Sequence, residues 1–232
     1  IFPAAVLLYW FVLGLQSGSA MAALGSATLN SIGASGLAAV FTTIAALPVA
    51  WLVVRRRGAL TIFLERLTYS AFALPGIVIA LSLVFFSINQ ALWLYQTLAL
   101  LVIGYGILFI PQAVGTIRTS LLQVHPSLEE AASSLGRRPG AVFFTITVPM
   151  LRSGLLAGAA MVFLTAMKEL PITLLLAPIG FKTLATTIWS SISEAFFAAA
   201  ALPALLIILF ASVPMAFMIL HEQKNEHDYR SM

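Results

Sequence analysis

Residues 130–149 read EAASSLGRRPGAVFFTITVP, a polar and basic stretch between long apolar segments. Ser127 and Glu130 have the S-x-x-E pattern of a capping box, which predicts that a short helix begins near Leu128. Gly136 predicts a left-handed C-terminal cap for this helix. The Pro-Gly pair that follows predicts a turn before a second short helix. The stretch is therefore predicted to be two short helices at an angle, outside the bilayer.

The composition of the whole chain predicts a membrane protein. Apolar residues make up 61% of the 232 residues and charged residues only 9%, with a mean hydropathy of +1.03, whereas soluble domains have about 25% charged residues. Apolar runs of about twenty residues without strand alternation favour helices over a barrel. The absence of cysteine excludes disulfides, iron–sulfur clusters and thiolate zinc sites.

The chain is predicted to be an all-α polytopic membrane protein with about six transmembrane helices. The spans are expected at residues 1–14, 32–54, 67–88 with a break at Pro75 and Gly76, 91–113, 151–167 and 198–220. We interpret 1–14 as the partial first span of a longer chain, because it begins abruptly without a charged flank. The membrane domain is expected to cover 15–220 and to be followed by a tail at 221–232.

Basic residues predict the orientation in the membrane. Arg55, Arg56 and Arg57 end the second span, and if they lie in the cytoplasm, ten of the twelve Lys and Arg residues lie on that side. Only Lys168 and Lys182 then lie outside. This asymmetry predicts that the loop 125–150 and the C-terminus face the cytoplasm.

The loop also carries an ordered spacing. EAA at 130–132 is followed after three residues by Gly136, and after nine more by the sequence ITVP at 146–149. This spacing resembles the EAA loop of binding-protein-dependent ABC importer permeases, with Val148 where Leu is usual. The resemblance implies the type I ABC importer permease (MetI-like) fold, with several passes through a bacterial inner membrane.

In that family the loop docks on the ATPase subunit and couples its closure to the membrane helices. The resemblance assigns this coupling role to Glu129, Glu130, Ala131, Ala132, Leu135, Gly136, Arg137 and Pro149. Ala131, Ala132 and Leu135 are predicted to form a face that another protein approaches closely. Glu130 has two compatible interpretations, completion of the capping box and pairing with a basic residue of the ATPase. Gly136 is likewise either an ordinary helix-ending glycine or a coupling glycine.

The partners follow from the same resemblance. They are two ABC ATPase subunits, which carry ATP and magnesium, a second permease half or copy, a periplasmic substrate-binding protein and the lipid bilayer, but no nucleic acid. The chain lacks the P-loop pattern, so it is expected to be a permease and not an enzyme, with no cofactor of its own. No metal site is expected, because its three histidines are assigned to the cytoplasmic side.

A second cluster lies at the outer end of the fifth span. Lys168 and Glu169 are adjacent ionisable residues, which are costly at membrane depth unless paired or hydrated. They are either an interfacial charge pair with Lys168 reaching outward, or an outer gate in which Glu169 faces the translocation path. Pro171 ends the span. Residues 181–193 are predicted to contain an interfacial helix.

The cargo is indicated only by resemblance. KELPITLLLAPIGFKTLATTIWSSISEAFFAAAALPALL from Lys168 and NSIGASGLAAVFTTIAALPVAWLVVRRR from Asn30 resemble the C-terminal half of fused ferric-iron importer permeases. Permeases for thiamine, phosphonate, sulfate or molybdate share the architecture and remain alternatives. An ion-coupled secondary transporter would need carboxylates in several spans, and a membrane scaffold would leave the EAA spacing unexplained.

Overall fold

The computed structural model describes the backbone of residues 2–16, 21–56 and 58–230, and the side chains of 5–14, 24–56, 58–213 and 216. In these ranges the regular secondary structure consists of helices without strands, which confirms the all-α prediction. The helices are α1 (Phe2–Gln16), α2 (Met21–Arg55), α3 (Ala59–Ser70), α4 (Gly76–Gln90), α5 (Leu98–Gln123), α6 (Pro126–Ser134), α7 (Pro139–Val142), α8 (Val148–Met150), α9 (Arg152–Met167), α10 (Pro171–Leu176), α11 (Leu184–Ser193) and α12 (Phe197–Arg230). Arg57 and the side chains of the tail at 221–232, which contribute to the predicted orientation, lie outside the described residues.

Several helices have the length and composition of membrane spans. Among the described residues, Leu24–Arg55 and Leu98–Gln123 are long and apolar enough to cross a bilayer. The number rises to four if two interrupted pairs, Ala59–Ala73 with Gly76–Gln90 and Pro139–Met150 with Arg152–Met167, each count as one span. Two apolar helices that are shorter than a span, Ala5–Gly14 and Phe197–Val213, overlap the predicted first and sixth spans.

The predicted break in the third span is confirmed, and the predicted start of the fourth is wrong. Leu74 is extended (φ −94°, ψ 128°), as expected for a residue that precedes proline, and a new helix begins at Gly76. Helix α5 begins at Leu98 instead of residue 91. Gln96 has a left-handed φ of 54°, and the Thr97 hydroxyl accepts the N–H of Leu100 at 3.2 Å as an N-terminal cap.

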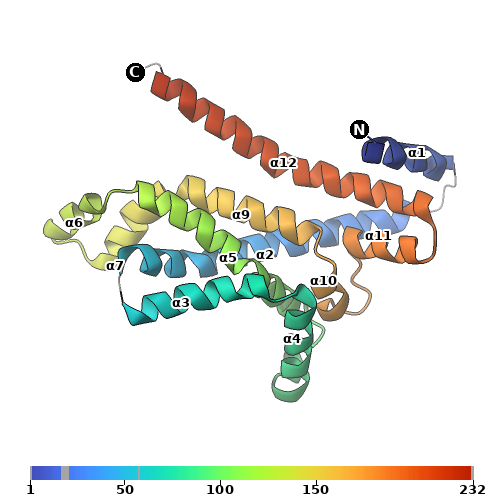
Figure 1. Cartoon of the computed structure of the whole chain (residues 1–232), viewed down its shortest axis with the longest axis horizontal. Helices are drawn as coiled ribbons and strands as arrows, with labels where there is room; N and C mark the ends of the chain where they lie inside the picture. The colour runs from blue at the N-terminus through green and yellow to red at the C-terminus, as the bar shows by residue number, and fades with distance from the viewer. Residues whose placement is uncertain (1, 17–20, 57, 231–232) are drawn as a thin grey trace. The chain divides into compact units, whose positions relative to one another are not determined.

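The chain forms two compact units, whose boundaries fall at Pro75 and within α2, α5 and α9. Unit 1 contains residues 1–38, 76–105 and 163–232. Within it α1 packs on α12, where the rings of Trp10 and Phe197 lie 5.7 Å apart (Figure 1). The core of this unit joins four buried side chains from α2, α9 and α11, namely Leu24, Ala27, Met167 and Leu184. Helix α10 packs on α4.

Unit 2 contains residues 39–75 and 106–162, and it holds the loop 125–150. Gly154 of α9 lies so close to the Ser120 side chain of α5 that an added Cβ would overlap it. Such small residues allow membrane helices to approach closely without polar side chains between them. An ion pair between Glu65 and Arg118 joins α3 to α5. Helices α5 and α9, which flank the loop, are thus packed against each other.

Candidate functional site: the loop between α5 and α9

The first helix of the loop, α6, begins two residues before the predicted Leu128. Pro126 occupies its first turn, where a fixed φ and a missing N–H suit a helix start. The cap is His125, whose Nδ1 accepts the backbone N–H of Ser127 at 3.3 Å. The Ser127 hydroxyl lies 2.7 Å from the same nitrogen. The predicted capping box of Ser127 and Glu130 is therefore wrong.

The predicted end of α6 is confirmed. Gly136 has a φ of +81°, in the left-handed region that favours glycine. Its N–H donates to the carbonyl of Ser133 at 3.0 Å, and the N–H of Arg137 donates to the carbonyl of Ala132 at 3.3 Å. This pair of bonds is a Schellman motif, which satisfies carbonyl groups that the last turn would leave unpaired.

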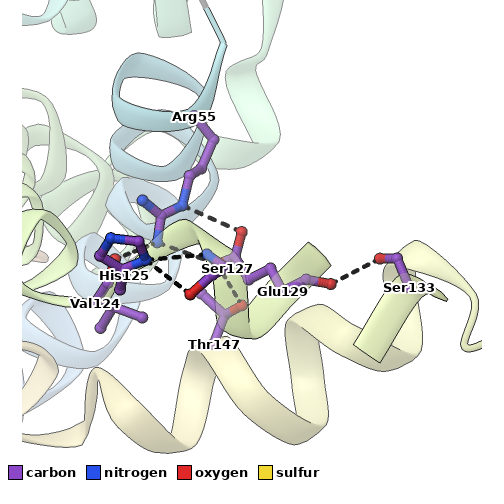
Figure 2. Close-up of polar contacts among 7 residues, drawn as sticks. All are labelled: Arg55, Val124, His125, Ser127, Glu129, Ser133 and Thr147. Carbon is purple, nitrogen blue, oxygen red and sulfur yellow. Dashed lines mark hydrogen bonds and ion pairs between the residues drawn. The ribbon is translucent and has the colours of Figure 1, made fainter. Parts of the chain in front are cut away.

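Glu129, and not its neighbour Glu130, is the carboxylate that holds the loop together. Figure 2 draws Glu129 with its partners Arg55 and Thr147. Its two oxygens accept hydrogen bonds from Arg55 at the end of α2, from Nε at 3.2 Å and from Nη2 at 3.3 Å. The Thr147 hydroxyl donates to Glu129 Oε1 at 2.9 Å. Arg55 Nη2 also donates to the carbonyl of Val124 at 2.9 Å. The side chains of Arg55 and Glu129 are only 10% and 17% exposed, so this pair is shielded from solvent.

We call α6 the first arm of the loop. The second arm runs from α7 through a π-helical turn, Phe143–Thr147, into α8. Pro149 has no backbone N–H, which favours a wider turn in the residues before it. The turn places Thr147, which is fully buried, against Glu129. The ring of Phe143 meets that of Trp51 from α2 edge-on, at 5.8 Å and 83°. The second short helix was predicted, whereas its π-helical turn was not.

The remaining coupling candidates divide into exposed and inward-facing residues. Glu130 and Ala131 are exposed, and the side chain of Glu130 has no hydrogen-bond partner in the described part of the chain. Leu135 is 85% exposed, whereas Ala132 is buried. The predicted contact face of Ala131, Ala132 and Leu135 is therefore wrong for Ala132, because α6 turns that side chain toward its own unit. Leu128 and Phe144 add exposed apolar surface to the loop that sequence reasoning did not identify.

The cluster at 168–171 lies in unit 1, and its two ionisable side chains do not form a pair. Glu169 accepts the N–H of Ile172 on its Oε1 at 3.3 Å, so it pairs with an N–H in the first turn of α10, whose first residue is Pro171. Burial raises the pKa of the Glu169 carboxyl, and this hydrogen bond opposes the rise. Lys168 is exposed, and no ion pair joins it to Glu169 among the described side chains. The charge-pair interpretation is therefore wrong.

The segment after α10 is fastened to the start of α2. The amide of Asn30 donates to the carbonyl of Lys182 at 3.0 Å. The buried hydroxyl of Ser31 accepts the N–H of Leu184 at 2.7 Å. Thr183 and Thr186 form a capping box that starts α11 at Leu184, which confirms the predicted helix in 181–193. The T-x-x-T spacing was the available signal for this cap.

Comparison with known proteins agrees with this architecture. The family model described as "Binding-protein-dependent transport system inner membrane component" matches residues 40–227. The Fe(3+)-transport system permease protein FbpB 2 of Haemophilus influenzae is 44% identical over 215 residues, which cover 92% of this chain but 42% of that protein. The sulfate transport system permease protein CysT of Escherichia coli is 32% identical over 196 residues, covering 79% of this chain and 70% of that one. The chain thus spans less than half the length of its ferric-iron relative.

Solved structures share the fold at low sequence identity. A chain of the MetNI methionine ABC transporter in an inward-facing conformation superposes with a TM-score of 0.69 at 15% identity, covering 87% of this chain and 95% of that chain. A chain of an amino acid ABC transporter gives a TM-score of 0.63 at 17% identity, with coverage of 92% and 98%. These likenesses confirm the predicted permease fold. The chain belongs to the family of binding-protein-dependent transport system inner membrane components, the permeases of ABC importers.

Proposed function

We propose that this chain forms part of the translocation path of an ABC importer and that its loop 125–150, hereafter the coupling loop, receives the movement of the ATPase subunits. The observation that carries the proposal is the coupling loop itself. It is a folded pair of helices, fixed internally by Glu129, that still exposes Leu135 and Phe144. Apolar side chains on a loop assigned to the aqueous side favour a protein partner, because their burial is worth about 25 cal/mol per Å².

The mechanism follows from how the loop is attached. Closure of two ATPase subunits on ATP displaces α6, and the loop transmits the displacement to α5 and α9, to which it is covalently joined. These helices then reorient between inward-open and outward-open states. The partners are the two ATPases, a second permease half or second copy, and a periplasmic substrate-binding protein that delivers the cargo. The basic residues support a cytoplasmic coupling loop and C-terminus, and the family of inner membrane components supports a bacterial inner membrane.

Leu135 provides a test of the docking role. Leu135→Glu places a charge on the apolar surface and should abolish co-isolation of the ATPase with the assembled permease. Ile179→Glu is the matched control, because Ile179 is 86% exposed, as Leu135 is at 85%, and lies in the predicted outer segment. The control should retain the ATPase. Retention of the ATPase by Leu135→Glu would refute docking through this surface.

For the cargo we propose ferric iron, supported by the similarity to a permease named for Fe(3+) transport. The relative named for sulfate transport keeps a sulfate-like anion as the second candidate. Glu169 and Pro171 are proposed to shape the outer gate, with Lys168 exposed beside them. Uptake of radiolabelled iron and of sulfate, each with its own binding protein, into vesicles holding the complete transporter distinguishes the two cargoes. Iron uptake that requires ATP supports the proposal, and uptake of sulfate alone would overturn it.

A further inference from the structure

The last turn of α2 contacts the coupling loop through two side chains. Trp51 and Arg55 are four residues apart, so they lie on the same face of α2. Trp51 packs edge-on against Phe143 in the second arm of the loop, and Arg55 binds Glu129 in the first arm. An aromatic contact and an ion pair therefore link the same helix face to both arms.

Arg55 also spans the joint between α5 and α6. Helix α5 ends at Gln123 and α6 begins at Pro126, and His125 between them is extended, with φ −67° and ψ 130°. Arg55 binds the carbonyl of Val124 before the joint and the carboxylate of Glu129 after it. A rotation of α6 relative to α5 would separate these two acceptors, and the guanidinium would lose one of them. The contact therefore holds the joint at a fixed angle.

Membrane orientation alone does not account for this placement of Arg55. A positive-inside signal requires only a charge near the interface, and the adjacent Arg56 supplies one while being exposed. The side chain of Arg55 is instead 10% exposed and has three hydrogen bonds to two acceptor groups. Burying a guanidinium in this way is unfavourable unless its acceptors are fixed in place.

We infer that Arg55 is a positioning residue. Together with Trp51, it attaches α2 to the coupling loop as a third helix beside α5 and α9. The chain attaches the loop directly only to α5 and α9, and Arg55 lies 74 residues before Glu129. Through these contacts α2 moves with the loop when the ATPases close. This inference rests on the proposed coupling function, and it adds a helix to which the motion is transmitted.

A crosslink tests whether α2 and the loop move as one body. The chain contains no cysteine, so Trp51→Cys with Phe143→Cys provides a thiol pair in the assembled transporter that a short bifunctional thiol reagent can join. The linked transporter should move at least as much solute per ATP as the unlinked one, because the link replaces the aromatic contact that the two substitutions remove. Loss of transport on linking would show that the two elements must separate, and would overturn the inference. Failure of the pair to link in the resting transporter would overturn the contact itself.

Substitutions separate coupling from stability. Arg55→Met should lower the solute transported per ATP by about tenfold, within the range by which coupling residues act, after correction for the amount of assembled complex. Arg55→Lys should recover part of the loss, because lysine restores the charge without the fork that reaches two acceptors. Arg56→Met is the matched control and should match wild type.

The outcomes distinguish the two levels of the proposal. If the wild-type chain does not retain its ATPase, the coupling function itself fails. If the ATPase is retained and Arg55→Met keeps the wild-type ratio of solute to ATP, only the role of Arg55 fails. A lower yield of complex with an unchanged ratio would assign Arg55 to stability alone and would also overturn the inference.

Discussion

Glu129 and Glu130 are adjacent and chemically identical, but the structure predicts very different consequences of removing them. Glu129→Ala deletes the acceptor of two Arg55 hydrogen bonds and one from Thr147. Removing one partner of a buried ion pair costs about 3 to 5 kcal/mol. Because this pair is only part-buried and Arg55 keeps the Val124 carbonyl, we expect the lower end, about 3 kcal/mol. Glu130→Ala alters an exposed side chain and should change stability by less than about 0.5 kcal/mol.

Hydrogen exchange of α6 measures the difference. A helix of nine residues is too short to be stable alone, so its protection depends on the contacts of Glu129. A loss of about 3 kcal/mol corresponds to exchange faster by about two orders of magnitude, up to the limit of an unprotected amide. Mass spectrometry of a peptide that covers 126–137, in the purified membrane complex, should show this acceleration for Glu129→Ala.

The Glu130→Ala variant is the matched control, because both substitutions place the same alanine in the same helix. Its exchange should stay within about threefold of wild type. Equal exchange rates in the two variants would refute the assignment of Glu129 as the residue that holds the loop. A larger effect of Glu130→Ala would instead assign that role to Glu130.

Three further predictions concern the ends of α6 and the packing beneath it. His125→Ala removes the N-terminal cap and should accelerate exchange in the first turn of α6 by the equivalent of about 1 kcal/mol; unchanged exchange there would contradict the cap. Gly136→Ala forces alanine into a left-handed conformation and should destabilise the end of α6 by about 1 kcal/mol, whereas Gly140→Ala, in open space without a positive φ, should not. Gly154→Ala should lower the melting temperature of the detergent-solubilised protein, because its Cβ overlaps a side chain of α5. The added Cβ of Gly158→Ala meets its nearest neighbour at 3.7 Å, so this substitution should be tolerated. Equal melting temperatures of the two variants would contradict the close packing.

Much of the fold was predictable because its signals are local. The proline at 75 and the left-handed glycine at 136 each interrupt a helix through their own backbone geometry, so the break and the cap appear where they were predicted. The start of α5 was placed seven residues too early, at 91 instead of Leu98. Residues 91–97 are largely apolar, and hydropathy does not detect a left-handed Gln96 or a capping Thr97.

The helical form of the loop could be predicted from the sequence, but its internal contacts could not. The EAA spacing identified the loop, whereas the ion pair at its centre joins residues 74 positions apart. Arg55 carried a clear charge signal, but nothing in the sequence distinguished it from Arg56. Only packing leaves the Arg55 side chain 10% exposed while Arg56 is exposed.

By itself, the amino-acid sequence determined that this protein is helical, resides in a membrane and has the EAA spacing of importer permeases, because composition, periodicity and short spacings are properties of the unfolded chain. Only the tertiary structure decided which glutamate faces inward. Neighbouring residues on a helix point about 100° apart, so the choice depends on where α6 begins and on what lies beside it. The cap at His125 sets the start, and the end of α2 supplies the partner, Arg55.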